Sequence, residues 1–375
     1  MPEYIQPGVY VEEVPTGARP ISAASTGTAA FFGIAPDARA APRSPVPVTS
    51  FADFQRTFAG DTATSTQLAC AVDGFFANGG TRLHVINLGQ GAKRIEEGDL
   101  AVIEPIEGIS LVAAPGFTDA GTYEAMIGAC EARSDWLAVL DCAPKIDDVA
   151  DLARPMAVGG LRPRSARNGV AAFYAPWIVM ADPIGRGRIA AAPSGAVCGL
   201  YARNDAQRGV HKAPAGLPVS GALGVTHLIT EREQAVLNPA GVNAIRQFPD
   251  GIKVWGARTL ADAAGDWLYV PVRRLATMIE QSIGRGTRWA VFEPNDEPLW
   301  TALRRDAGAF LHGLWREGAL AGGKPDEAYF VKCGRDTMTQ ADIDSGTVIA
   351  LVGIAPVRPA EFIVIRIVQS AAGTR

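Results

Sequence analysis

The chain has 375 residues, of which 48% are hydrophobic and 20% are charged. This composition is typical of a folded globular protein and excludes a disordered or collagen-like chain. The formal net charge of −4 provides no overall basic field for nucleic acid or an anionic membrane. The length exceeds that of one ordinary core and predicts two or three domains.

Cysteine usage and the absence of apolar runs indicate a soluble chain. The five cysteines are scattered and form no CxxC pair, which predicts reduced core thiols made in a cytosol. The first residues lack the basic and apolar regions of a secretory signal. No apolar run approaches the roughly 20 residues that a membrane-spanning helix needs.

Turn chemistry sets the first 22 residues apart. Four prolines within residues 2–20 exclude a helix, and residues 9–14 between them read as an extended strand. The sequence Pro-Thr-Gly-Ala-Arg-Pro that follows cannot form a tight hairpin. We therefore expect this strand to dock on a distant part of the fold or on another chain.

The next segment, residues 23–98, mixes strands, loops and short helices. A strand of small residues is predicted over 28–34, followed by a proline-rich loop over 36–47. A helix over 68–76 should stop at Asn78-Gly79-Gly80, and a strand should follow over 83–88.

Residues 99–260 alternate between strands and helices. Strands are predicted over 109–114, 136–140 and 170–180, and helices over 122–133 and 147–158. This alternation predicts a parallel sheet with helices on its faces, which is an α/β fold.

The region from residue 261 begins with a predicted helix over 272–283, which Gly284 should close, and a strand over 289–292. A second helix should run to residue 317. Asn295 or Asp296 can cap this helix, with Pro298 in its first turn.

The strand predicted near the end of the chain, residues 360–369, is apolar on both faces. Such a strand is costly to leave uncovered. It is therefore either central to a sheet or given to a partner.

The search for catalytic and ligand motifs favours a non-enzymatic role. The four histidines form no metal-ligand pattern, and no complete phosphate-binding loop or nucleophile elbow is present. We predict no cofactor and no metal. An α/β hydrolase-like enzyme remains the alternative, with Ser194, His211 and Asp141 as the least unfavourable triad. A serine-reactive probe would label Ser194 in such an enzyme.

Several segments resemble the contractile tail sheath proteins of phages, phage-like bacteriocins and extracellular contractile injection systems. The N-terminal part contributes Pro7–Val14, Arg19–Ile21 and Ser25–Gly33. The middle of the chain contributes Pro193–Gly195, Ala202–Asp205, Arg208–Pro214, Leu237–Pro239, Gly241–Asn243 and Val254–Leu260. The most similar segment is Val291–Trp300, and Pro359–Phe362 follows near the end. The matches keep their order along nearly the whole chain and are weak only over residues 35–190.

The resemblance implies an α/β and α+β fold in five parts. These are an N-terminal linker arm (1–22), the N-terminal part of the sheath body (23–98), a subtilisin-like α/β domain (99–260), an α+β tube-facing domain with a terminal exchange strand (261–369), and a tail (370–375). No catalysis carries over, because a Gly-Thr-Ser motif is lacking and relatives resemble Trp where His211 stands.

The resemblance also implies stacked hexameric rings that form a helical sheath around an inner tail tube. The partners implied are other copies of the chain, the tube protein, and baseplate and tail terminator proteins, with no nucleic acid and no direct membrane insertion. Assembly would occur in the bacterial cytoplasm, as part of a virion tail or tail-like particle. A baseplate-type adaptor that forms only rings is a further possibility.

Two sets of residues carry the implied contacts. Tube-facing candidates lie on the helix over 296–317 and in loops around 285–288 and 318–326, and are Arg285, Arg288, Arg304, Arg305 and Lys324. Strand exchange between subunits is implied for Val9, Tyr10, Val11, Glu12, Glu13, Val14, Phe362, Ile363, Val364, Ile365, Arg366, Ile367 and Val368.

Overall fold

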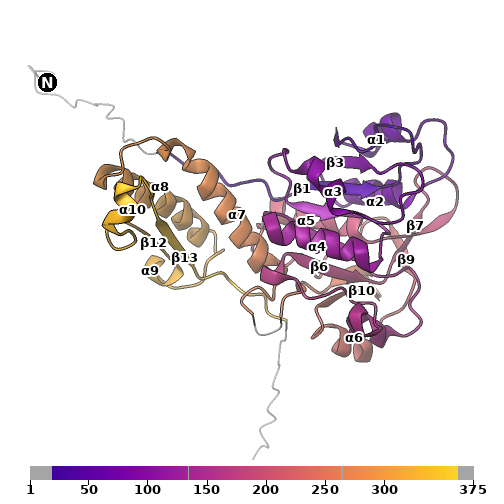
Figure 1. Cartoon of the computed structure of the whole chain (residues 1–375). Coiled ribbons are helices and arrows are strands. Elements are labelled where there is room, and N and C mark those ends of the chain that lie inside the picture. Colours follow the sequence, from indigo (N-terminus) through magenta and orange to yellow (C-terminus); the bar gives the residue numbers. More distant parts are fainter. Residues whose placement is uncertain (1–18, 134, 263–264, 362–375) are drawn as a thin grey trace, which may run out of the picture. The chain divides into compact units, whose positions relative to one another are not determined.

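The computed structural model describes residues 19–133, 135–262 and 265–361 of the chain. It divides into two units, and each is described by itself. The larger unit comprises residues 24–279 and continues from residue 356, whereas the smaller unit comprises residues 280–355 together with the segment before residue 24. Figure 1 shows the course of the chain and the element labels.

The elements of the larger unit are eleven strands and six complete helices within its described residues. The strands are β1 (Thr28–Gly33), β2 (Val46–Val48), β3 (Arg82–Asn87), β4 (Leu111–Ala113), β5 (Leu137–Asp141), β6 (Ala171–Ala175), β7 (Ile178–Ala181), β8 (Arg188–Ala191), β9 (Ala222–Val225), β10 (Val242–Phe248) and β11 (Gly251–Trp255). The helices are α1 (Phe51–Phe58), α2 (Gln67–Ala77), α3 (Glu97–Leu100), α4 (Ala120–Arg133), α5 (Ser194–Arg208) and α6 (Glu231–Leu237).

The division between the units falls within α7 (Val270–Gly286). The remaining elements belong to the smaller unit and are α8 (Glu297–Arg316), α9 (Pro325–Ala328), β12 (Tyr329–Cys333), α10 (Gln340–Asp344) and β13 (Ala350–Ile354).

An eight-stranded sheet organises the larger unit, in the order β11-β10-β6-β5-β4-β1-β3-β2. The six inner strands are parallel, and β11 and β2 are antiparallel to their neighbours. The parallel sheet predicted from the strand–helix alternation is therefore confirmed. A separate three-stranded sheet has the order β8-β7-β9.

Both edges of the eight-stranded sheet are shielded. At one edge β2 has only three residues, and one of them is Pro47, which has no N–H to donate. At the other edge the chain at Pro218 pairs with Lys253 of β11, and Gly216 donates to the carbonyl of Val254. Shielding of this kind limits pairing with other strands.

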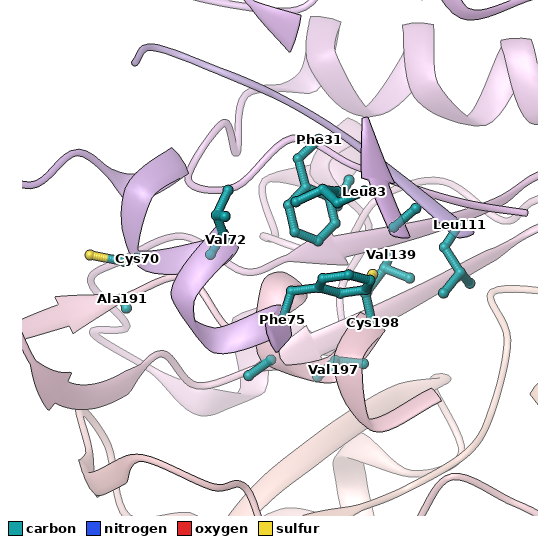
Figure 2. Close-up of a cluster of buried hydrophobic side chains, with 14 of the residues drawn as sticks. Phe31, Cys70, Val72, Phe75, Leu83, Leu111, Val139, Ala191, Val197 and Cys198 are labelled. Carbon is teal, nitrogen blue, oxygen red and sulfur yellow. The ribbon is translucent and has the colours of Figure 1, made fainter. Parts of the chain in front are cut away.

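Helices cover both faces of the sheet because its strands are apolar on both faces. In β1, Phe31 packs into the layer formed with α2 and α5, whereas Phe32 packs into the layer formed with α4 and α6. Figure 2 shows the first layer, where the rings of Phe31 and Phe75 meet edge to face with centroids 5.5 Å apart. The core of the unit thus lies on both sides of the central strands.

Two predictions for the larger unit, one helix and one strand, are wrong. The helix expected over 147–158 consists of two short 3₁₀ turns, Val149–Leu152 and Met156–Val158. Pro155 lies between them, lacks an N–H and would clash with a preceding carbonyl in an α-helix. The strand expected over 170–180 is split at Pro176, because β6 belongs to the eight-stranded sheet and β7 to the three-stranded one.

The smaller unit contains an antiparallel pair of strands, β12 and β13, beside α8. Of the two predicted caps, Asn295 and Asp296, it is Asp296 that caps α8, since its side chain accepts from the N–H of Leu299. Pro298 lies in the first turn, and buried Leu299, Trp300 and Leu303 form the apolar stripe of the helix.

Two predictions for the smaller unit are wrong. Helix α7 does not stop at Gly284 but continues to Gly286, where a Cβ would lie 2.7 Å from a methylene carbon of Ile21. Gly286 therefore allows a close approach of the N-terminal segment. The strand expected over 289–292 is a 3₁₀ turn, Arg288–Ala290, followed by Phe292 with a φ of +73° that extended structure excludes.

The predicted boundary between residues 98 and 99 does not coincide with a boundary between the units. Strands β1, β2 and β3 from the first segment share one sheet with β4, β5 and β6 from the second. None of the helices in the described ranges combines the length and apolar character needed to cross a membrane.

Candidate functional site

The small sheet of the smaller unit is the first functional candidate. It has only two strands among the residues described, paired from Tyr329 with Ile354 to Cys333 with Ala350. A two-stranded sheet is marginally stable by itself, and its outer edges carry backbone groups that can pair with another strand. Phe330 and Leu351 leave 51% and 49% of their surfaces exposed.

An apolar hollow of about 190 Å³ lies beneath this sheet. Its walls combine strand residues Val331, Ala350 and Val352 with helix residues Leu303 and Ala307. Val331 and Val352 are cross-strand partners, so the hollow lies on the helix-facing side of the strand pair. A hollow of this kind can receive apolar side chains from an added strand.

The N-terminal segment enters the smaller unit at Arg19. The Arg19 guanidinium lies 4.3 Å from the centroid of the Trp289 ring, which is a cation–π contact. Ile21 is buried two residues later. The six N-terminal residues predicted for strand exchange, Val9–Val14, lie outside the described residues.

The C-terminal segment is anchored to the larger unit at Glu361, which does not lie in a strand although one was predicted from residue 360. The carboxylate of Glu361 accepts from Nε of Arg258 at 3.0 and 3.2 Å and from Nη2 at 2.5 Å. These side chains are only 16% and 11% exposed. Arg258 is itself fixed, because its N–H donates to Asn243 at 2.7 Å and its Nη1 to the carbonyl of Asn238. The pair raises the pKa of Arg258, so the guanidinium is always charged.

This anchor was not predicted as a contact. Both partners lie in segments used for the resemblance, Val254–Leu260 and Pro359–Phe362, but sequence alone did not indicate that they meet. The seven C-terminal residues predicted for strand exchange, Phe362–Val368, begin directly after the anchor and lie outside the described residues.

The tube-facing candidates all belong to the smaller unit, but they differ in how far their side chains are exposed to solvent. Arg288 and Lys324 are exposed, whereas Arg285 is half-buried near the end of α7. Arg304 bridges elements, since it pairs with Glu297 at 2.5 Å and also donates to the carbonyl of Cys333. Arg305 donates from Nε to Asp306 at 2.9 Å. Arg304 therefore also ties α8 to β12.

A strongly exposed aromatic residue was missed by the sequence analysis. Phe292 is fully exposed beside Val291, which is 62% exposed, in the segment most similar to the sheath family. The strand predicted there would have buried part of its ring. Its positive φ is the feature that could not be anticipated for a bulky residue.

The alternative triad is not assembled. Ser194 begins α5, and His211 follows the end of that helix, so a 15-residue helix about 22 Å long separates them. The hydroxyl of Ser194 donates directly to Asp141 at 2.7 Å, and its N–H donates to the same carboxylate at 2.7 Å. Both residues are buried. The arrangement caps α5, and burial raises the pKa of Asp141 to about 7.

A crevice of about 460 Å³ lies at the carboxyl ends of β1 and β4. Open α/β sheets commonly bind ligands at such a point, where successive strands diverge to opposite sides. Here the polar groups serve the fold: Gln67 bonds the chain at Ala190 and Ala192, and Asp119 accepts from Thr122 in the first turn of α4.

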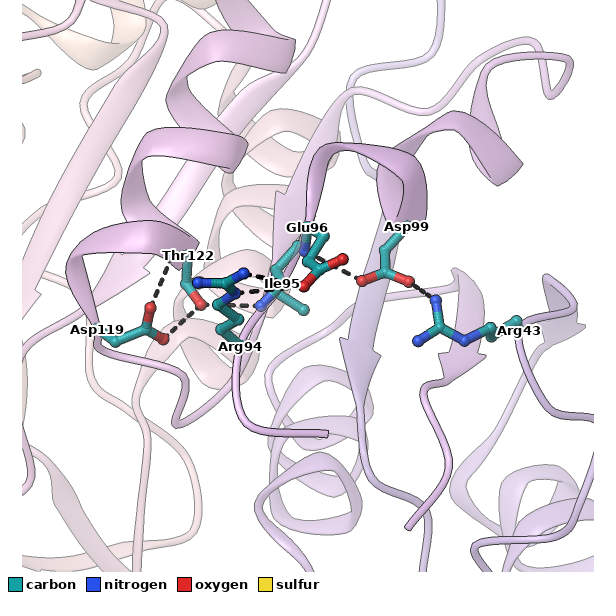
Figure 3. Close-up of polar contacts among 7 residues, drawn as sticks. All are labelled: Arg43, Arg94, Ile95, Glu96, Asp99, Asp119 and Thr122. Carbon is teal, nitrogen blue, oxygen red and sulfur yellow. Dashed lines mark hydrogen bonds and ion pairs between the residues drawn. The ribbon is translucent and has the colours of Figure 1, made fainter. Parts of the chain in front are cut away.

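Four of the six charged residues around a neighbouring hollow are likewise paired with one another. Figure 3 shows that Arg94 pairs with Glu96 at 3.2 Å and that Arg43 pairs with Asp99. Across the described ranges, no group of three or more His, Cys, Asp or Glu is placed to hold a metal ion. We assign no ligand to either hollow.

Comparisons with known proteins identify the family. Residues 164–260 match a family model described as phage tail sheath protein central domain, and residues 262–370 match one described as phage tail sheath C-terminal domain. The tail sheath protein of Enterobacteria phage T4 is 27% identical over 181 residues. That match covers 47% of this chain but only 27% of the phage T4 protein, about a quarter of its length.

Solved structures match over almost the whole chain. The sheath of the PVC extracellular contractile injection system in its contracted state is 32% identical, with a TM-score of 0.83 over 99% of both chains. A chain of the six-fold symmetrised baseplate of the anti-feeding prophage is 33% identical, with a TM-score of 0.75 over 98% of this chain and 100% of that one. Matches of this identity, length and order leave one assignment: the chain belongs to the phage tail sheath family.

Proposed function

We propose that the chain is the structural subunit of a contractile sheath, which polymerises as stacked hexameric rings around an inner tube and contracts to drive the tube through a target envelope. The similarity to a contracted injection-system sheath over 99% of both chains supports this role. The observation that carries it is the small sheet above an apolar hollow, which has two strands among the described residues, because a subunit that must join others needs such an acceptor.

Strand exchange would complete that sheet. In this proposal Val9–Val14 and Phe362–Val368 leave one subunit and add to the β12–β13 pair of neighbouring copies. Backbone hydrogen bonds along the added strands would supply affinity, and alternate side chains would fill the hollow. The Arg258–Glu361 anchor supports the proposal because it fixes the point where the C-terminal strand departs.

The proposed partners beyond the chain itself are the inner tail tube protein, the baseplate and the tail terminator. Similarity to a chain of the anti-feeding prophage baseplate supports a baseplate contact. Among the tube-facing candidates, Arg288 and Lys324 have exposed side chains, and their positive charges suit acidic groups on a tube. The particle would assemble in the bacterial cytoplasm and act as a virion tail or tail-like device.

No catalytic step is proposed. The energy of contraction would come from the change in buried interface between two arrangements of nearly rigid subunits. Each 100 Å² of apolar surface newly buried contributes about 2.5 kcal/mol. Summed over many subunits, changes in buried interface of this size would supply the energy of contraction. The direct hydrogen bond between Ser194 and Asp141 supports a structural role for both residues.

Negative-stain electron microscopy of the purified chain, with and without a tube protein, tests the proposal. Long hollow tubes or stacked rings are expected, and a monomer under all conditions would refute self-assembly. Rings that never stack would favour a baseplate-type adaptor.

Variants of the two arms test strand exchange itself. Val11→Pro or Ile365→Pro should leave a folded, soluble subunit that forms no tubes, because proline removes a ladder hydrogen bond. Ala371→Pro, beyond the predicted strand, is the matched control and should assemble normally. Tubes formed by Ile365→Pro would show that the C-terminal arm is not exchanged.

A further inference from the structure

Asp306 is a buried acid that the described residues only half satisfy. It lies on α8 within the smaller unit and is 3% exposed. Its Oδ1 accepts from Nε of Arg305 at 2.9 Å, but its buried Oδ2 has no hydrogen-bond partner among the residues described. The Arg305 side chain is 42% exposed, so water weakens its compensation of the charge. A buried carboxylate oxygen without a donor is costly and points to a missing partner.

The position of Asp306 connects it with the proposed strand acceptor. Ala307, the next residue, and Leu303, nearly one turn earlier, both line the apolar hollow beneath β12 and β13. A side chain entering this hollow from an added strand would therefore approach the part of α8 that carries Asp306. The partner needed there is a hydrogen-bond donor, and best a cation.

The two segments proposed to add differ in charge. Residues 1–18 contain Glu3, Glu12 and Glu13 but no Lys or Arg side chain. Residues 362–368 contain a single charged residue, Arg366, flanked by two isoleucines. An arginine within an apolar strand needs a carboxylate when the strand is buried. The acceptor side therefore has one carboxylate oxygen without a donor among the described residues, and the C-terminal segment carries one cation that can supply it.

We propose that Asp306 of one copy binds the guanidinium of Arg366 from the C-terminal segment of a second copy. This inference rests on the proposed strand exchange and names its recognition contact. The contact would select the C-terminal segment over the acidic N-terminal one at this site. It would also fix the register, because a slip of one residue turns Arg366 to the opposite face and a slip of two moves it by about 7 Å.

A double-mutant cycle on the full-length chain tests the contact. We would compare Asp306→Asn, Arg366→Met and the double variant by the subunit concentration at which tubes first form. Each single change should raise this concentration on the order of 100-fold. The double variant should be no worse than the more severe single one, because both changes remove the same contact. The proposal would be overturned if the double variant raised the tube-forming concentration by the product of the two single increases.

The stability of the unassembled subunit is an independent test of the same contact. Below the assembly concentration, Asp306→Asn should keep or raise the urea midpoint of unfolding, since it removes a buried carboxylate that accepts only through Oδ1, from the partly exposed Arg305. A clear loss of stability there would mean that Asp306 is satisfied within its own chain, which would also overturn the proposal. Asp326→Asn, an exposed acid of the same unit, and Arg375→Met, beyond the predicted strand, are controls expected within twofold of the unmodified chain.

The outcomes separate this contact from strand exchange as such. If Ile365→Pro abolishes tubes but Arg366→Met assembles normally, exchange stands and the Asp306–Arg366 contact is wrong. If Ile365→Pro also assembles normally, the exchange of the C-terminal strand fails, and the contact fails with it.

Discussion

Replacing Glu361 by Gln should release the C-terminal anchor without unfolding the larger unit. The change removes the negative charge from three N–H···O contacts with Arg258 at 2.5 to 3.2 Å. Breaking a buried ion pair from one side costs about 3–5 kcal/mol, because the remaining charge stays buried. Here the side chains of Arg258 and Glu361 are 11% and 16% exposed, and Gln keeps an amide oxygen that can still accept from Arg258. We therefore expect the change to weaken attachment of the segment by about 2–3 kcal/mol.

The loss of stability should affect the attachment of residues 356–361 and not the unfolding of the whole unit. Residues 356–361 can detach from the larger unit, after which Arg258 reaches water and most of the penalty disappears. A cost of about 2.8 kcal/mol therefore becomes a roughly 100-fold rise in the detached population, at tenfold for each 1.4 kcal/mol. The urea midpoint for unfolding of the sheet should change little.

Hydrogen exchange resolved by peptide is the suitable assay. Faster exchange confined to the segment around Ala360 is expected for Glu361→Gln. Arg358→Gln is the matched control, because Arg358 pairs with Asp266 at 3.4 Å and both side chains are exposed, at 61% and 88%. That change should cost less than about 0.5 kcal/mol. The reasoning is refuted if the two variants exchange equally fast.

Three further predictions concern the core and the smaller unit. Burial raises the pKa of Asp141 to about 7, against about 4 in the unfolded chain, so stability should fall as pH rises between these two values; Asp141→Asn should flatten this part of a urea-midpoint profile, and an unchanged slope would contradict the assignment. Phe31→Ala should lower the free energy of unfolding by about 3–5 kcal/mol in chemical denaturation, because the ring is fully buried against Phe75; a loss below about 1 kcal/mol would argue against this packing. A fluorophosphonate probe should leave Ser194 unlabelled in mass spectrometry of the folded chain, since the residue is buried and bonded to Asp141, and stoichiometric labelling would revive the enzyme alternative.

The sequence was informative where local chemistry decides the structure. The parallel strands over 28–34 and 136–140 were predicted because their apolar residues and flanking turns leave few alternatives. The spacing to Pro298 placed the cap of α8 at Asn295 or Asp296, and the structure has it at Asp296. In contrast, Gly284 looked like a helix stop, but packing of Ile21 against Gly286 carries α7 further, and sequence spacing does not report that contact.

The candidate site was predictable only in part. The resemblance supplied the terminal segments and the tube-facing arginines, which remain proposals. The Arg258–Glu361 anchor joins residues 103 positions apart in the chain, and the half-satisfied oxygen of Asp306 depends on the packing of α8. Such features arise from tertiary structure, for which a single sequence has no local signal.

The shielded edges of the eight-stranded sheet have a consequence for unwanted pairing between copies of the chain. A chain that polymerises by exchanging strands risks uncontrolled cross-β aggregation wherever a second sheet offers an edge. Here the short β2 with Pro47 and the covered edge of β11 remove that risk from the largest sheet. The described residues thus separate a large sheet with shielded edges from a small sheet of two strands, and under the proposed strand exchange only the small sheet would accept a strand.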